Sequence, residues 1–393
     1  MSTFAAVKCW LLIIWALFPL ALTAGTARPA DLSSPIDEAS FHRGILRPVG
    51  WLMDYLKNAN RETSRPFDCS FICGPTYKST TSFALGGGMT GLYKWDRNDP
   101  ALQQSSVNLF FNASVTGMLK LSLEGHNYMR GDRQRWDYEL YVENLPTDFW
   151  GIGYRNGVRN ENKSSYHQIR ASFKPNYLFR MAPSFYLGPE LRFQHSHSFK
   201  VRRPDYLEGQ QYDITSTGLG IAVQYDSRDF ALNAYRGNFI RIEQLFFPKF
   251  MNTYWFNSTE LTIRSYRQAW RGGVLAMDLH GLFNYGGPVP WTMLSLVGGN
   301  GRMRGYYEGR YRDRNILEGQ VELRQHLFGR FGCVVWAGAA NVFHDRRHIY
   351  MNEVLPSVGT GVRWEFKRRV NIRLDFGLTK NKPGFEFSIN EAF

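Results

Sequence analysis

The sequence lacks two features that would assign it to common protein classes. After residue 24, none of its 393 residues belongs to a hydrophobic run long enough for a membrane-spanning helix. It also lacks a concentrated basic tract, because the Lys and Arg residues behind its net charge of +13 are spread along the chain. The first absence excludes a helical membrane protein downstream of the leader. The second argues against a nucleic-acid partner and fits a surface that faces anionic lipid.

Catalytic patterns are also missing. The sequence has no Gly-x-Ser-x-Gly elbow, which a hydrolase of that type would need. Ser122 and His126 have no evident third group, and His195 and His197 are too few to hold a metal ion. The histidines in the run 344–348 are read as polar loop residues. We therefore expect no enzyme activity, no cofactor and no metal site.

Cysteine is scarce, with four residues in the chain. Cys69 and Cys73 have three residues between them, so a local disulfide is open to them in an oxidising periplasm. A metal site is disfavoured there, because no further Cys or His lies nearby to complete four ligands. Cys333 is interpreted as a small apolar residue.

The start of the chain has the organisation of an export signal. Lys8 precedes the apolar run 9–24, which contains Pro19, and the small residues 25–27 follow. A charged start, a short apolar core and a small-residue cleavage site define a signal peptide. We therefore expect residues 1–27 to be removed and the protein to be exported.

The chain after the leader divides into two parts. Residues 28–76 are not barrel-like and are expected to form a short periplasmic or lumen-entering segment, with an amphipathic helix over 46–60. From residue 77 to 393 the period becomes two, most clearly over 370–379, where apolar side chains alternate with polar ones. Such alternation predicts strands with one lipid-facing and one lumen-facing side.

The alternating segments predict the fold. They lie at 80–93, 104–116, 117–128, 135–145, 165–175, 184–198, 213–226, 238–248, 255–267, 270–284, 291–298, 315–327, 331–343, 356–366, 369–379 and 383–393. Their even number, about sixteen, and the 29 Phe, 21 Tyr and 11 Trp residues are typical of outer-membrane barrels. We expect an all-β protein, a closed antiparallel transmembrane β-barrel in the bacterial outer membrane, in contact with its lipid and lipopolysaccharide.

The last expected strand places Phe385, Phe387, Ile389 and the terminal Phe393 on one face. A terminal aromatic residue in this setting is typical of the signal by which outer-membrane proteins reach their assembly machinery. We therefore expect Phe393 to act as that signal and the barrel assembly machinery to be a partner during insertion.

One long connection stands out. The run 299–315 reads G-N-G-R-M-R-G-Y-Y-E-G-R-Y-R-D-R-N, which is too polar for a strand interior and too rich in Gly and Arg for a helix. Long loops are usually functional or disordered. Two interpretations stay open at this point, a solvated loop and a functional one.

Several motifs occur along the chain in a characteristic order. They are Gly74-Pro75-Thr76-Tyr77 with Gly86-Gly87-Gly88, Asp148-Phe149-Trp150-Gly151-Ile152-Gly153, Tyr225-Asp226-Ser227-Arg228-Asp229, Met303-Arg304-Gly305-Tyr306 and Gln320-Val321-Glu322-Leu323-Arg324. Together they resemble the BamA/TamA-type assembly and translocation barrels of the bacterial surface antigen superfamily. The resemblance covers roughly residues 74–393, with Leu323 in place of the usual aromatic residue.

The resemblance implies that Arg304 folds back into the lumen and pairs with acidic residues. Glu322 points inward in the expected register and is the expected partner, because a guanidinium and a carboxylate form a strong directional link. The segment 338–341 lacks the second acid that the family often has, so either the network is thinner here or another group such as Glu318 substitutes. The other residues assigned to the family motifs are Met303, Gly305, Tyr306, Asp226, Arg228, Asp229 and Arg324.

The resemblance also implies a function, the insertion or translocation of protein or lipid at the outer membrane. The family usually carries POTRA domains before the barrel, whereas residues 28–76 are too few for one. We therefore expect a short form that works with a separate periplasmic partner. Residues 86–88 would weaken the first strand and let it part from the last. The alternatives are a passive pore and a structural or surface protein.

Overall fold

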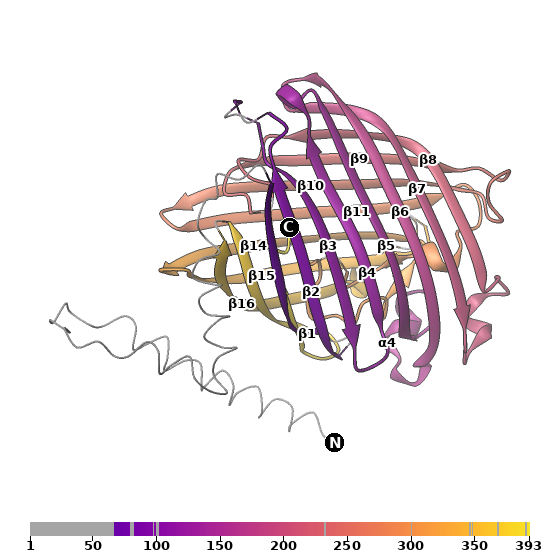
Figure 1. Cartoon of the computed structure of the whole chain (residues 1–393). Helices are drawn as coiled ribbons and strands as arrows, with labels where there is room; N and C mark the ends of the chain where they lie inside the picture. The colour runs from indigo at the N-terminus through magenta and orange to yellow at the C-terminus, as the bar shows by residue number, and fades with distance from the viewer. Residues whose placement is uncertain are drawn as a thin grey trace, which may run out of the picture. The chain divides into compact units, whose positions relative to one another are not determined.

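The structure is a computed structural model that describes residues 67–393, apart from residues 79–81, 97, 100, 101, 232, 300, 346, 348, 368 and 390. The expected signal peptide and the expected helix over 46–60 lie outside the described residues. Within them, sixteen strands form one closed antiparallel barrel, β1 to β11 followed by β14 to β18 (Figure 1). The predicted fold class is confirmed.

The barrel strands follow one another around the wall in chain order. They are β1 (Phe67–Lys78), β2 (Ser82–Tyr93), β3 (Ser105–Ser114), β4 (Leu119–Tyr128), β5 (Gln134–Phe149), β6 (Ser164–Ala182), β7 (Phe185–Phe199), β8 (Asp213–Asp226), β9 (Gly237–Phe247), β10 (Phe256–Trp270), β11 (Gly273–Tyr285), β14 (Asn315–Phe328), β15 (Phe331–Phe343), β16 (Leu355–Lys367), β17 (Val370–Thr379) and β18 (Gly384–Ile389).

The connections hold only short elements. They are η1 (Arg130–Asp132), α4 (Tyr154–Val158), η2 (Asn160–Asn162), η3 (Pro204–Leu207), η4 (Trp291–Met293), η6 (Met351–Glu353) and the two-residue strands β12 (Ser295–Leu296) and β13 (Arg312–Asp313). No helix in the described part of the chain is long and apolar enough to cross a membrane.

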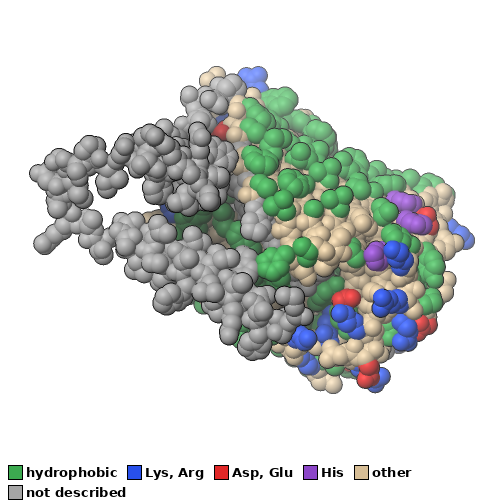
Figure 2. Space-filling model, turned by 60° about the horizontal axis from the view of Figure 1, so that its bottom comes forward, with side chains coloured by type: hydrophobic (Ala, Val, Ile, Leu, Met, Phe, Trp, Pro, Cys, Tyr) green, Lys and Arg blue, Asp and Glu red, His purple; other side chains and the backbone are tan. Residues whose placement is uncertain are grey.

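Side chains alternate between the outer wall and the lumen. In β17, Arg373 and Asp375 are buried, whereas Phe376 and Leu378 are exposed on the outside. Figure 2 shows hydrophobic side chains gathered over the outer surface. Because a charged side chain is costly in lipid, the polar residues turn inward and the burial pattern of a soluble protein is inverted.

The two ends of the barrel differ in the length of their connections. Outer-membrane barrels have short turns at the periplasmic end and longer loops outside. One end therefore reads as periplasmic, with the two-residue turns 183–184, 271–272 and 329–330, and the other as extracellular, with the long loops 150–163, 200–212 and 286–314.

Two strand predictions were wrong. One barrel strand was missed and one was predicted within a loop, so the expected total did not change. Residues 67–78 form β1, so the barrel begins before the expected start at residue 77. Residues 291–298 form no barrel strand, because they contain η4 and the short β12, which pairs with β13 alone. Pro75 interrupts the strand pattern of β1, although the run from Phe67 to Cys73 before it alternates clearly.

The three glycines 86–88 also lie elsewhere than expected. They belong to the second strand, β2, where Gly87 pairs with Cys73 of β1 and Phe111 of β3. A Cβ atom on Gly87 would lie 2.2 Å from the Phe111 ring. Gly87 therefore makes room for the Phe111 ring on the outer wall, and any weakening of the barrel by Gly86–Gly88 acts one strand away from its ends.

The first testable prediction concerns the thiols of β1. Cys69 and Cys73 both lie exposed on one extended strand and are free. Residues four apart on a strand are separated by about 13 Å, whereas a disulfide needs Cα atoms within about 7 Å. Alkylation in denaturant without reductant should label both cysteines as fully as Cys333. If the peptide that contains both cysteines has a mass two hydrogens lower than its reduced form, the prediction is contradicted.

Candidate functional site

The long connection between β11 and β14 is a structured loop packed inside the barrel. β12 and β13 close its base through the pairs Ser295–Asp313 and Leu296–Arg312. Its tip is buried, and Met303 and Tyr306 pack in one apolar cluster with residues of β14 to β16. Met303 adopts a positive φ of 46°. A solvated loop would expose these residues, so the loop is a packed part of the barrel interior and the solvated interpretation is wrong.

Arg304 sits at the centre of this loop tip. Only 2 % of its surface is exposed. Its Nη1 donates to Asp375 Oδ2 at 3.0 Å, and its Nη2 donates to Glu322 Oε2. The guanidinium carbon also lies 3.7 Å from the centre of the Trp336 ring. One cation therefore links the loop to β14, β15 and β17 at once, with charge-assisted bonds and a cation–π contact.

The two carboxylates that hold Arg304 belong to a larger buried network. Glu322 also accepts from Arg324 Nε at 2.7 Å, and Asp375 from Arg363 Nη1 at 2.6 Å. Further arginine and acidic partners continue the network along β16 to β18. They are Arg373 with Asp375 and Glu386, and Arg363 with Glu391. Buried charges need such partners, because an unpaired one costs several kcal/mol.

Three glycines allow the loop tip to lie directly on the last two strands. A Cβ atom on Gly377 of β17 would lie 2.4 Å from the Arg304 carbonyl oxygen, and one on Gly384 of β18 would lie 2.4 Å from the Gly305 carbonyl oxygen. Gly305 itself has a φ of 100°, which other residues rarely adopt. The glycine of the motif is therefore required both for its backbone conformation and for this close contact.

The remaining loop arginines also have fixed partners. Their acceptors lie on the strands and loops around them: Arg302 donates to Asp278, Arg310 to Gly157 and Asn160, Arg312 to Tyr166, and Arg314 to Asn284 and Gly287. The Tyr306 hydroxyl donates to the Pro356 carbonyl oxygen, and burial raises the pKa of Tyr306 to about 12, so this donor stays neutral.

The predicted acidic partners of Arg304 are partly right. The structure brings Arg304 and Glu322 together. Glu318 is not the second partner, because its carboxylate bonds to His280 Nδ1 at 2.9 Å. Asp375 takes that place. Its inward position could be read from the alternation of 370–379, but its approach to Arg304 depends on β17 lying near the loop tip.

The motif at the end of β8 organises the periplasmic end of the lumen. Asp226 is buried and binds Arg228 Nε at 2.9 Å and Arg135 Nη1 at 3.1 Å. Asp229 accepts from the backbone N–H of Tyr235 with one oxygen. The motif thereby shapes the connection 227–236, of which Asn233 and Ala234 are buried.

The same connection is tied to a distant turn. The second oxygen of Asp229 accepts from Arg369 Nη1 at 2.6 Å, and the Arg369 guanidinium lies 4.1 Å from the centre of the Tyr235 ring. Arg369 belongs to the turn between β16 and β17, which are six and seven strands around the barrel from β8. The connection 227–236 therefore extends across the periplasmic mouth.

The end of the chain also enters the lumen. Phe393 is buried among Ala234, Tyr266 and Ala276, and its carbonyl oxygen accepts from Arg324 Nη2 at 2.8 Å. The expectation that Phe393 shares the outer face of β18 is wrong, since the strand ends at Ile389 and buried hydrogen bonds favour the inward position. Its role as an assembly signal stays a prediction.

Three of the histidines considered in the sequence contact neighbouring polar side chains. His195 and His197 point the same way, as expected, but onto the outer wall, where His195 contacts Thr215 and His197 contacts Asp213. His126 bonds to Asp137 rather than to Ser122. Among the described residues, no three His, Cys, Asp or Glu side chains are placed to hold a metal ion.

A closed barrel of sixteen strands, with an arginine-bearing loop packed in its lumen, defines a class of outer-membrane barrels. The chain belongs to the Omp85 superfamily, since the model of the Omp85 superfamily domain matches residues 103–393. No curated protein matches the chain.

Solved structures show the same fold. BamA from Haemophilus ducreyi lacking POTRA domains 1–3 matches with a TM-score of 0.54 and 14 % identity over 84 % of this chain and 71 % of that one. CdiB from Acinetobacter baumannii matches with a TM-score of 0.56 and 13 % identity, over 84 % and 60 %. CdiB from Escherichia coli matches with 0.54 and 12 %, over 83 % and 63 %. The chain thus spans under two thirds of either CdiB.

The second prediction concerns the bonds from Arg304 to Glu322 and Asp375, which hold the loop in the lumen and are called the loop lock here. Arg304→Ala removes both carboxylate bonds and should destabilise the packed loop by about 2 kcal/mol, because charge-assisted bonds are lost in a buried site. Trypsin should then cut the loop between residues 299 and 314, which the native protein should resist. Arg155→Ala is the matched control, since Arg155 makes a single exposed pair with Glu353. Equal resistance of the Arg304 variant would show that the loop is held without its arginine.

The third prediction concerns the tie across the periplasmic mouth. Burial alone would raise the pKa of Asp229, but the bond from Arg369 and two backbone N–H groups lower it. A lowered pKa means that the tie is fully formed at neutral pH and is lost as the pH falls through that value, below 3.8. Asp229→Asn replaces the carboxylate that faces Arg369 with an amide. The channel current of this variant should be noisier at pH 7, whereas the current of the native protein should become noisier only in strong acid. Asp205→Asn, in the exposed pair with Arg203, should leave the current unchanged.

Proposed function

We propose that this Omp85 barrel inserts or translocates protein, or lipid, at the bacterial outer membrane. The single observation that carries the proposal is the weakness of one seam in the wall. Among the described residues, β1 and β18 are joined by one residue pair, Lys78 with Glu386. On its other side, β1 pairs with β2 without interruption from Phe67–Tyr93 to Lys78–Ser82.

The sequence of the two end strands explains the weak seam. β18 is the shortest strand of the barrel and ends at Ile389. β1 contains Pro75, which has no backbone N–H to donate, and proline in sheets is confined to edges. Opening this seam would break few backbone hydrogen bonds, whereas opening any other would expose a full ladder to lipid. The seam is therefore the place where a client could enter the membrane sideways.

The loop lock lies beside this seam. Gly377 and Gly384, on the last two strands, carry the backbone of the loop tip, and Arg304 bonds to Asp375 on β17. A change in the position of the loop would therefore act directly on β17 and β18. This supports a coupling between the loop and the seam, in which Arg304 holds the last strands in place.

A passive pore is the second candidate, and the contents of the lumen argue against it. The loop tip with Arg304 packs inside the barrel, while the connection 227–236 and Phe393 occupy its periplasmic end. A pore for steady diffusion needs an open water-filled lumen. Steady large conductance of the native protein in planar bilayers would favour the pore.

The fourth prediction tests the seam with a disulfide. Cα atoms of directly paired antiparallel residues lie about 4.5–5.5 Å apart, which suits a disulfide. The double variant Lys78→Cys, Glu386→Cys should crosslink β1 to β18. Cells depleted of the native protein should lose particular proteins or lipids from the outer membrane, as measured by mass spectrometry. The oxidised variant should fail to restore them, and reductant should rescue it.

The matched control joins two strands away from the seam. Thr360 and Phe376 are paired between β16 and β17, and their double cysteine variant should restore the outer membrane whether oxidised or reduced. Full restoration by the locked seam variant would exclude sideways opening. Depletion without any change in the outer membrane would exclude the proposed function as a whole.

A further inference from the structure

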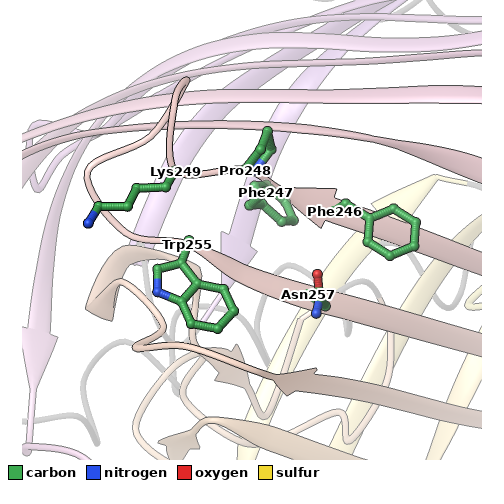
Figure 3. Close-up of a pocket in the computed structure, with 6 residues that line it drawn as sticks. All are labelled: Phe246, Phe247, Pro248, Lys249, Trp255 and Asn257. Carbon is green, nitrogen blue, oxygen red and sulfur yellow. The ribbon is translucent and has the colours of Figure 1, made fainter.

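The outer wall carries an amphiphilic pocket at its extracellular end, on the hairpin of β9 and β10. Six residues line it, Phe246, Phe247, Pro248, Lys249, Trp255 and Asn257, and its volume is about 320 Å³ (Figure 3). The hairpin connection 248–255 lies at the end of the barrel with the long loops, which is the side of the outer leaflet. No part of the proposed function uses this site.

The walls of the pocket are aromatic and open to the outside. The side chains of Phe246 and Trp255 are 52 % and 45 % exposed. Phe247 backs the pocket from the inner side, where it is buried and stacks on Phe256 with 4.2 Å between ring centres. This stack makes the back wall rigid. Trp255 is fixed by the glycine pair Gly286–Gly287, since a Cβ atom on Gly287 would lie 2.0 Å from its carbonyl oxygen.

Two polar groups at the pocket have no partner within the described residues. The Lys249 ammonium forms no ion pair there, and the Asn257 amide forms no hydrogen bond there. In Figure 3 Asn257 lies between the rings of Trp255 and Phe246, and Lys249 extends away from them. Other cations at this end are engaged, such as Arg203 with Asp205. A free ammonium beside exposed aromatic rings favours a ligand with a negative group and an apolar part.

The polar residues just below the pocket locate it with respect to the membrane. On the outer wall, Gln244 Oε1 accepts hydrogen bonds from Thr259 Oγ1 at 2.6 Å and from the Tyr285 hydroxyl at 3.1 Å. Gln244 precedes Phe246 by one step on the same face of β9 and lies nearer the middle of the barrel. An outward polar cluster marks the edge of the hydrocarbon layer, so the pocket lies at the level of the headgroups.

We propose that this pocket binds a phosphate-bearing acyl lipid of the outer leaflet. Lys249 binds the phosphate, Asn257 hydrogen-bonds the polar backbone of the headgroup, and Phe246 and Trp255 cover the first methylene groups of the acyl chains. The complementarity is that of an ammonium with a phosphate and of aromatic rings with hydrocarbon. The general belt of interfacial aromatic residues differs from this site, because it needs neither the lysine nor the phosphate.

The experiment uses the full-length protein in detergent and hexa-acylated lipid A with two phosphates as the probe. Native mass spectrometry measures the bound fraction as the lipid is titrated. Native protein should bind the phosphorylated lipid about tenfold more tightly than the same lipid with its phosphates removed. Lys249→Gln should abolish that preference, and Trp255→Ala should weaken the binding of both lipids. Heat-modifiable gel migration checks that each variant is folded.

Two control variants separate a site from a non-specific surface. Lys200→Gln removes an exposed lysine from the neighbouring extracellular loop, and Trp136→Ala removes an exposed tryptophan near the periplasmic end of β5. Both should bind lipid as the native protein does. Equal binding of the two lipids by native protein, or an equal loss in Lys200→Gln, would overturn the proposal and leave only an interfacial belt.

Discussion

The pairing of Arg304 with Glu322 and Asp375 is the interaction on which the inside of this barrel depends. A buried guanidinium needs carboxylate partners, and Arg304 has one on each of two strands. The pairing therefore holds a loop, a strand from the middle of the chain and a strand from its end in one arrangement. It turns a long polar connection into a packed part of the core.

Neighbouring strands of the barrel are paired along most of their length, except at the junction of β1 and β18, the seam, where the pairing is weak. A membrane sheet must close, because unpaired backbone groups in lipid are costly. In the described part of the chain, one residue pair joins β1 to β18, while ion pairs within the lumen hold the last strands. Loss of the lock at Arg304 would thus be felt first at β17 and β18. The charged networks of the described residues lie in the lumen, and the seam is the junction with the fewest described backbone pairs.

The comparison of sequence with structure shows where local patterns succeed and fail. Alternation identified fifteen of the barrel strands, but it counted 291–298, which has the same short-range pattern and lies in a loop. It passed over β1, since Pro75 looks like a break and a proline is tolerated at the weak edge that only the closed barrel reveals. Glu318 and Asp375 both face the lumen by alternation, and nothing local distinguishes the true partner of Arg304.

The sequence alone determined which side chains face lipid and which face the lumen, because that depends on a period of two along each strand. It also determined that the segment around Arg304 is special, because a run of arginines and glycines suits neither strand nor helix. The tertiary structure decided everything that depends on strands far apart in the chain. It chose Asp375 over Glu318, turned Phe393 inward, and joined Asp229 to Arg369 across the mouth, since these contacts are set by the curvature and closure of the barrel and not by neighbours in sequence.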